Sequence, residues 1–191
     1  PESRVDRRRF VRAEIDNVND YATFGLELAA RWNKLLLYGE YLYTTLSRYA
    51  WEGEQKVALR NAVFNGWYAT ASYMILGQNR RYAPEDAEFG PMDVRRRGGN
   101  LEVAARVSTV NLNDFHDPAA VITGGEAFNY TASLNWYPRR NVLVGLNYTY
   151  VDNDKYADDK GHVTFGGRPL SQSLKNGIDF SIFQMRLMVS F

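Results

Sequence analysis

Cysteine is absent from this chain of 191 residues, and proline is scarce, at 6 residues. Without cysteine, neither a disulfide framework nor a thiolate metal site can form. Although 45% of the residues are hydrophobic, no apolar run approaches the roughly 18 residues that a transmembrane helix needs. Collagen-like and disordered classes are excluded as well, because aromatic and aliphatic side chains are plentiful.

An excess of charge of one sign is also lacking, since 23 Lys and Arg residues face 22 Asp and Glu residues. The matched charges give no reason to expect nucleic acid as a partner. No phosphate loop, nucleophile elbow or dinucleotide fingerprint occurs. Asp114, His116 and Asp117 are interpreted as turn chemistry rather than a metal site. We therefore expect no enzyme, no metal and no cofactor.

The dominant positive feature is an alternation of apolar and polar residues, sustained over stretches of about ten residues, which is typical of transmembrane β-strands. The clearest stretch alternates Phe128, Tyr130 and Ala132 with polar residues. Asn33-Lys34 predicts a two-residue hairpin turn. In all, we predict seven strands over residues 21–32, 35–43, 63–75, 101–108, 128–136, 142–150 and 183–191.

The first part of the chain gives a weaker pattern. We expect residues 1–20 to be a polar lead-in and residues 21–191 to be the barrel portion. Residues 5–15 alternate well enough to suggest an eighth strand, but Arg7, Arg8 and Arg9 are consecutive, and one of them would face lipid. The start at Pro1, without Met or a signal-peptide core, suggests a processed protein or a C-terminal fragment.

Two folds fit such strands, a soluble β-sandwich or lipocalin-like barrel and an outer-membrane barrel. Bulky aromatic residues near both ends of the apolar faces, such as Trp32, Trp67 and Trp136, favour the membrane barrel with its aromatic girdles. Loop asymmetry favours it too, because short turns contrast with predicted long polar loops at 47–62, 113–126 and 153–177. The prediction is an all-β, antiparallel transmembrane β-barrel.

The segment 77–99 breaks this asymmetry, because alternation of strand direction assigns it to the end with short turns. It is rich in arginine, which binds oxyanions bidentately. The alternative is a solvated tether, as for most charge runs. Arginines on the polar faces of strands would be held more rigidly. The candidate anion pathway therefore consists of Arg31, Arg106, Arg186, Arg80, Arg81, Arg95, Arg96 and Arg97.

Several stretches resemble the phosphate-selective porin O/P family. The similarity is carried, in chain order, by Gly66–Gly77 with Arg81-Tyr82, Leu101–Arg106 with Asn111–Asp114, Gly124-Gly125, Leu134–Tyr137, Asn147–Asp152 and Phe183–Leu187. The resemblance implies a sixteen-stranded outer-membrane barrel, usually a homotrimer, of which this chain would be the C-terminal half. It also implies that an insertion from the periplasmic side, corresponding to 77–99, folds into an anion path.

The functional expectation is a porin of the bacterial outer membrane, with membrane lipid and small anions such as phosphate or polyphosphate as its partners. An alternative from another class is a structural barrel that conducts little and anchors or assembles with other envelope proteins. An enzyme built on a barrel is the third and weakest reading. Ion conductance separates the first two hypotheses.

Overall fold

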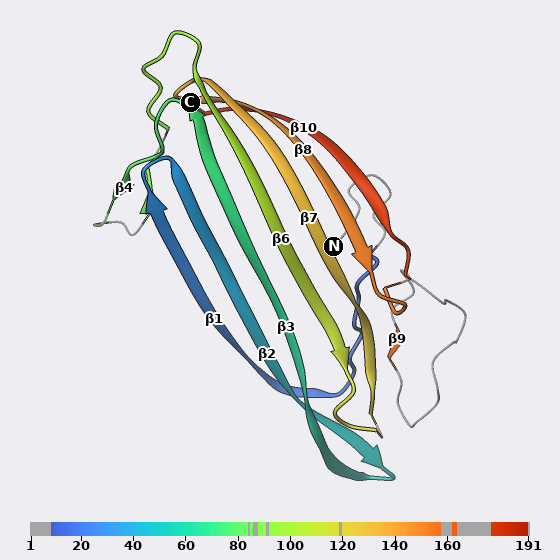
Figure 1. Cartoon of the computed structure of the whole chain (residues 1–191). Helices are drawn as coiled ribbons and strands as arrows, with labels where there is room; N and C mark the ends of the chain where they lie inside the picture. The colour runs from blue at the N-terminus through green and yellow to red at the C-terminus, as the bar shows by residue number, and fades with distance from the viewer. Residues whose placement is uncertain are drawn as a thin grey trace.

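The computed structural model describes residues 9–83, 85, 88–90, 92–118, 120–157, 162–163 and 177–190. Most of them form one curved antiparallel sheet (Figure 1). Among the described residues, no helix is long and apolar enough to cross a membrane. The strands are β1 (Val18–Trp32), β2 (Leu35–Glu52), β3 (Gln55–Leu76), β4 (Tyr82–Ala83), β5 (Glu88–Phe89), β6 (Asn100–Asp114), β7 (Ile122–Arg139), β8 (Val142–Asn153), β9 (His162–Val163) and β10 (Phe180–Val189).

The long strands lie in the order β1-β2-β3-β6-β7-β8-β10, and each pairs antiparallel with the next. They confirm the seven predicted strands, and most are longer than predicted. The last predicted position, 191, lies outside the described residues. The two-residue turn at Asn33-Lys34 is also confirmed, with Asn33 at a φ of 53°. The sheet is not closed within this chain, because β1 and β10 are its two edges.

The prediction of a loop over 47–62 is wrong. β2 and β3 continue as a paired hairpin as far as Glu52 and Gln55, and the chain turns at Gly53, which has a φ of 65°. β3 has 22 residues, and at about 3.3 Å per residue it spans about 70 Å. The apolar band of an outer-membrane barrel is only about 25 Å tall. The polar part of this hairpin therefore continues as β-structure beyond that band, where apolar alternation is not needed.

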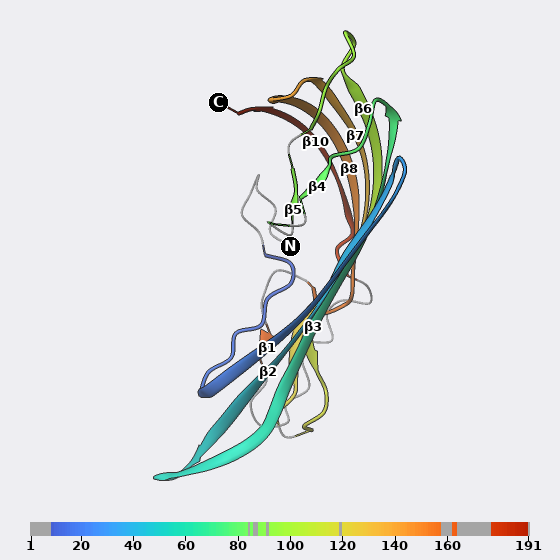
Figure 2. The ribbon, with the colours of Figure 1, turned by 90° about the vertical axis from the view of Figure 1, so that its left-hand side faces the viewer.

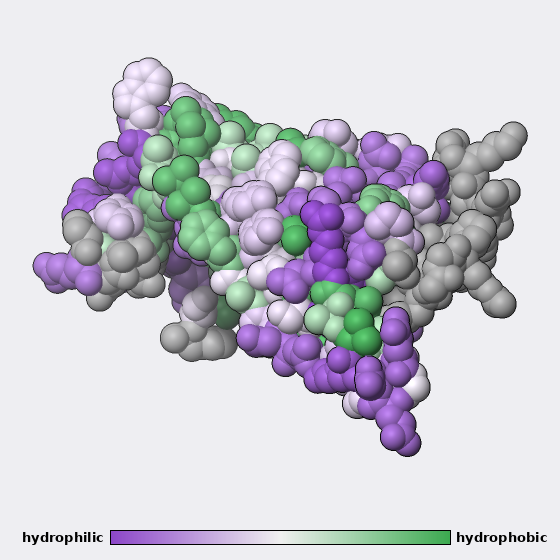
Figure 3. Space-filling model, turned by 90° about the horizontal axis from the view of Figure 1, so that it is seen from below, coloured by the Kyte–Doolittle hydropathy of each residue, from purple (hydrophilic) through white to green (hydrophobic). Residues whose placement is uncertain are grey.

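Curvature gives the sheet two different faces (Figure 2). The convex face exposes large apolar side chains, including Leu28 at 71% and Trp32 at 81% of their surface. Predicted lumen residues share the other face, as the register pairs Glu27 with Glu40 and Arg106 with Thr70. Seen from below, hydrophobic residues (green) gather in the upper and central part of the view, whereas hydrophilic residues (purple) gather at the left and at the projecting lower end (Figure 3). An apolar outside around a polar inside is the pattern of a transmembrane barrel.

Residues 9–17 lie against the concave face (Figure 2) and form no strand beyond a single bridge at Arg9. Their apolar side chains face the sheet: Val11 packs in one cluster with the start of β7, whereas Ala13 and Ile15 pack against another. The Arg12 N–H donates to the carbonyl of Gly124 at 2.7 Å. Over residues 9–15, the alternation thus reflects an extended segment laid on the wall. Residues 5–8 lie outside the described residues.

Candidate functional site

The segment 77–99 leaves and rejoins the sheet at two glycines. Gly77 has a φ of 94° and Gly99 a φ of 78°, in the left-handed region that favours glycine. A Cβ on Gly77 would lie 2.2 Å from Oδ1 of Asn100, and one on Gly99 would lie 2.4 Å from the carbonyl oxygen of Tyr137. The sequence therefore needs glycine at both positions. In Figure 2, β4 and β5 of the insertion lie on the concave side of the sheet, whereas the chain that leads into β6 rises above its rim.

Hydrogen bonds from the strand ends hold this insertion in place. Asn100 Nδ2 donates to the carbonyl of Asp93 at 2.9 Å. From β1, the Arg31 guanidinium donates to the carbonyl of Arg80, also at 2.9 Å. The charged side chains of the insertion are thus carried on a backbone that the barrel wall positions.

One apolar contact supplements these bonds. Met92, 3% exposed, packs against Met74 of β3 and Tyr137 of β7, which are 0% and 5% exposed. Val94 and Leu143 border the same cluster. Burying a methionine side chain is worth about 1.5–3 kcal/mol. Met92 is therefore the apolar anchor of the insertion on the lumen side of the sheet.

A groove of about 960 Å³ lies where the insertion meets the turn between β1 and β2. The described residues lining it include five cationic side chains and one carboxylate: Arg31, Lys34, Arg81, Arg95, Arg96 and Asp93. The carboxylate of Asp93 already accepts a hydrogen bond from Nε of Arg95 at 2.9 Å. The groove consequently carries a net positive charge at the end of the molecule with two-residue turns. We call it the basic groove.

Four of the eight predicted arginines, Arg31, Arg81, Arg95 and Arg96, thus line the basic groove. Arg97 is exposed in the turn that follows them and does not line it. Neighbouring Arg80 points elsewhere, into a second cavity between the insertion and the sheet. In an extended segment, successive side chains point in opposite directions, and this separates Arg80 from Arg81.

The remaining two predicted arginines lie on the wall itself. Arg106 of β6 stacks on the ring of Tyr68, with its guanidinium carbon 3.8 Å from the ring centroid. Arg186 of β10 is exposed on the same face, opposite Gly145 of β8. Neither lines the basic groove, so the structure divides the eight residues among several places instead of gathering them.

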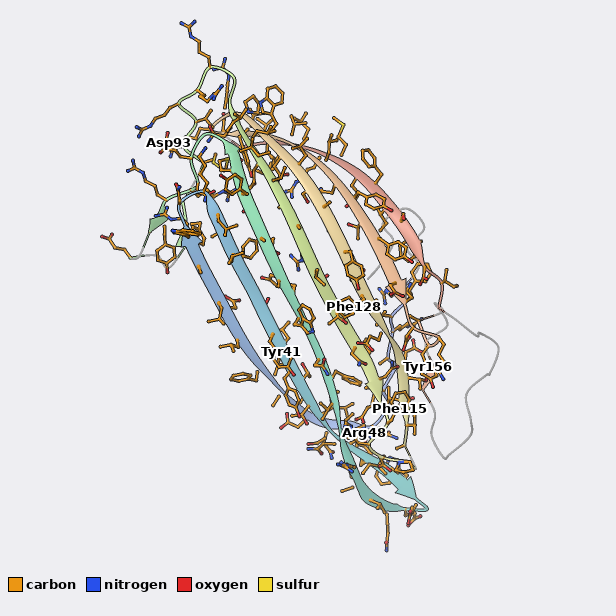
Figure 4. All side chains as sticks on the ribbon, viewed as in Figure 1. Tyr41, Arg48, Asp93, Phe115, Phe128 and Tyr156 are labelled. Atoms are coloured by element: carbon orange, nitrogen blue, oxygen red, sulfur yellow. The ribbon has the colours of Figure 1, made fainter. Side chains whose placement is uncertain are left out.

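At the opposite end of the sheet, buried polar contacts join the connections between strands, and the sequence analysis missed these contacts. Arg48, 3% exposed, donates to the carbonyls of Ala120 at 3.0 Å and Arg60 at 3.1 Å. Figure 4 places Arg48 with Phe115 and Tyr156 at this end, far from Asp93. A buried charge is retained only when such acceptors satisfy it. Arg48 therefore ties the 115–121 connection to the β2–β3 hairpin.

Asp114 makes a second set of polar contacts at this end of the sheet. Its carboxylate accepts hydrogen bonds from the backbone N–H of Val63 at 2.8 Å and from the backbone N–H of His116 at 2.9 Å, and it lies 2.7 Å from Nδ1 of His116. These contacts are turn chemistry. In the described part of the chain, no group of three or more His, Asp or Glu residues is arranged to hold a metal.

The fold and site define a class. A curved antiparallel sheet with an apolar exterior, a polar interior and inward-folded segments is the wall of an outer-membrane β-barrel of the porin type. Two-residue turns join β1 to β2 and β7 to β8 at one end, and at the other end the β2–β3 hairpin extends beyond its neighbours.

The chain matches the sequence model of the family "Phosphate-selective porin O and P" over residues 1–191, and it belongs to that family. It is also 24% identical over 147 residues to Porin O of Pseudomonas aeruginosa, in an alignment that covers 74% of this chain and 32% of that protein. The chain thus spans about a third of the length of the curated relative it matches. Family and relative both indicate the bacterial outer membrane as its location.

Proposed function

We propose that this chain forms part of the wall and mouth of a water-filled channel through which small anions, such as phosphate or polyphosphate, diffuse across the outer membrane. The observation that carries the proposal is the basic groove, with five cationic side chains against one carboxylate. The membership of a porin family favours a channel over an enzyme.

The chemistry of the groove suits a phosphate oxyanion. Planar guanidinium groups donate two parallel hydrogen bonds to such an anion. Arg95 and Arg96 are exposed, so an anion bound there remains partly hydrated and is held weakly. Conduction requires this balance, because a site must attract an ion and then release it.

Beyond the mouth, the wall offers further cationic positions. Arg106 and Arg186 project from strands into the concave side, and strands hold a side chain more rigidly than loops do. Between them lie polar residues such as Thr131 and Asn147, which solvate a water-filled interior. We propose that an anion passes from the basic groove along this face.

Reversal potentials in planar bilayers test the proposal with the full-length protein. Replacing Arg95, Arg96 and Arg97 together by Gln should lower the anion-to-cation permeability ratio several-fold, because two groove charges and one adjacent charge are lost. Replacing Arg139 and Arg140 by Gln is the control, compared with the double replacement of Arg95 and Arg96, which removes the same number of charges. Arg139 and Arg140 carry the same charge at the same end and line neither cavity, so the ratio should stay near the wild-type value.

An unchanged ratio in the triple variant would refute the role of the groove. A wild-type protein that inserts but passes no current would instead support the structural barrel that anchors or assembles with other envelope proteins. We also propose that the whole protein is a homotrimer in contact with outer-membrane lipid; the support is the likeness to the family. Cross-linking in isolated outer membranes should then yield a species of three chains.

A further inference from the structure

A second cavity, of about 530 Å³, lies between the insertion and the concave face of the sheet. This volume is within the usual range for small-molecule sites. Tyr82 and Phe89 line it from the β4–β5 hairpin, and Tyr38 and Tyr68 line it from β2 and β3. We call it the aromatic cavity. It is separate in composition from the basic groove, with which it shares only Tyr82.

The rings of the aromatic cavity are arranged edge to face. Tyr38 and Tyr68 have centroids 6.3 Å apart at 79°, and Tyr82 and Phe89 have centroids 5.2 Å apart at 62°. The faces of aromatic rings are electronegative and attract cations. One of these rings already demonstrates this, because the guanidinium of Arg106 lies 3.8 Å from the centroid of Tyr68.

Two carboxylates, Glu27 and Glu102, line the same cavity. Oε2 of Glu102 accepts hydrogen bonds from the hydroxyl of Tyr137 at 2.9 Å and from Nδ2 of Asn135 at 3.2 Å. These two bonds fix the orientation of the Glu102 carboxylate at the cavity wall. The charged side chains lining the cavity are these two carboxylates and Arg80. The lining side chains therefore carry one net negative charge, opposite in sign to the basic groove, and Arg106 lies beyond them against the ring of Tyr68.

A buried hydroxyl completes the site. Ser72 of β3 lines the cavity and is 4% exposed. Its Oγ has no hydrogen-bond partner among the described residues. Buried polar atoms in folded proteins are normally paired, so a hydroxyl of this kind at a cavity wall marks a position for a ligand hydrogen-bond donor.

We propose that the aromatic cavity binds a primary ammonium ion carried on a small apolar or aromatic body. The ammonium group has three donors, and two of them suit the carboxylate of Glu102 and the oxygen of Ser72, which pairs with Ala104 two residues from Glu102. The rings hold the apolar body and add cation–π attraction. This site goes beyond the proposed anion pathway, because its ligand is a cation held by a carboxylate and aromatic rings.

The test uses full-length protein in detergent micelles, with benzylammonium chloride as the probe and benzyl alcohol as its uncharged isostere. Calorimetric titration and saturation-transfer NMR measure both. We expect benzylammonium to bind at least tenfold more tightly than benzyl alcohol. Glu102→Gln should weaken benzylammonium binding about tenfold, whereas Arg80→Gln should tighten it, because that change removes the resident competing cation. Glu52→Gln, at the exposed tip of the β2–β3 hairpin, should change nothing.

Equal binding of the two probes, or an unchanged affinity in Glu102→Gln, would overturn the proposal. Ser72→Ala provides a second variant that removes a single small group, and a few-fold loss of affinity is expected from it. Intrinsic tryptophan fluorescence confirms that each variant is folded. The failure of this site is distinguishable from failure of the anion channel, because the Arg95, Arg96 and Arg97 replacements alter reversal potentials without touching the aromatic cavity.

Discussion

The concave face carries two inward segments, residues 9–17 and the insertion 77–99, and they are attached in different ways. Residues 9–17 are held mainly by apolar packing: Phe10 contacts the ring of Phe180 at 4.7 Å between centroids, and Val11 is buried. The insertion has one buried apolar anchor, Met92, among its described residues, and depends on hydrogen bonds from the strand ends.

The difference indicates how segments can occupy the interior of a barrel while charged side chains stay exposed to that interior. An apolar underside lets residues 9–17 lie flat on the wall, with Arg12 and Glu14 forming an ion pair on the opposite side. In the insertion, polar attachment leaves Arg95 and Arg96 exposed to the basic groove. Residues 9–17 therefore cover the sheet by apolar packing, whereas the insertion presents charge to the basic groove.

The largest expected effect comes from the glycine at which the insertion rejoins the sheet. Gly99→Val forces a β-branched residue into a left-handed conformation, which costs about 1–3 kcal/mol, and adds a clash with the Tyr137 carbonyl, 2.4 Å from the new Cβ. We expect the urea midpoint of unfolding to fall markedly, measured by tryptophan fluorescence in micelles.

Gly98→Ala is the matched control for that experiment, because a Cβ there meets nothing within 4 Å. It should leave the midpoint nearly unchanged. If Gly99→Val proved as stable as Gly98→Ala, the left-handed attachment of the insertion would be wrong.

An intermediate effect should follow from cutting the apolar contacts. Met92→Ala should cost about 2 kcal/mol, the lower end for a buried methionine, because it removes the buried apolar anchor of the insertion. Val11→Ala should cost less, since Ala13 and Ile15 still hold residues 9–17 on the sheet. Hydrogen exchange should rise across 92–99 in the first variant and stay nearly unchanged around 9–17 in the second. If hydrogen exchange rose equally in both segments, the inferred difference in how they are attached would be wrong.

The smallest effect on stability is expected for the exposed charges. Arg95→Gln breaks an ion pair with Asp93 whose arginine side chain is 73% exposed, and such surface pairs contribute about 0–1 kcal/mol. The unfolding midpoint should shift little, and the shift should shrink further in high salt. A loss comparable to that of Met92→Ala would show that charge, and not packing, attaches the insertion.

Much of the fold was predictable from the sequence, because a wall between lipid and water imposes alternation on every strand that crosses it. The hairpin turn at Asn33-Lys34 was predictable, because asparagine tolerates a positive φ. The polar hairpin around Gly53 was not predictable by the same rule. Beyond the lipid, the strands pair through their backbones, and side chains no longer need to alternate.

The candidate site was predictable in part. The segment 77–99 is at the predicted end of the sheet, and three of its arginines, Arg81, Arg95 and Arg96, line the basic groove. The split between Arg80 and Arg81 was not foreseeable, because it depends on how the β4–β5 hairpin folds back, with the N–H of Gly90 donating to the carbonyl of Arg81 at 2.9 Å. The role of Glu102 was missed for a similar reason: its partners Asn135 and Tyr137 come from another strand.

The close approach of Gly77 to Asn100 has one more consequence. Departure and return of the insertion occur at a single point on the wall, so β3 and β6 pair as neighbours just beyond it, with Leu76 opposite Leu101. The wall is therefore continuous whatever the intervening chain contains. A change in the length or sequence of the insertion should therefore leave the pairing of β3 with β6 intact.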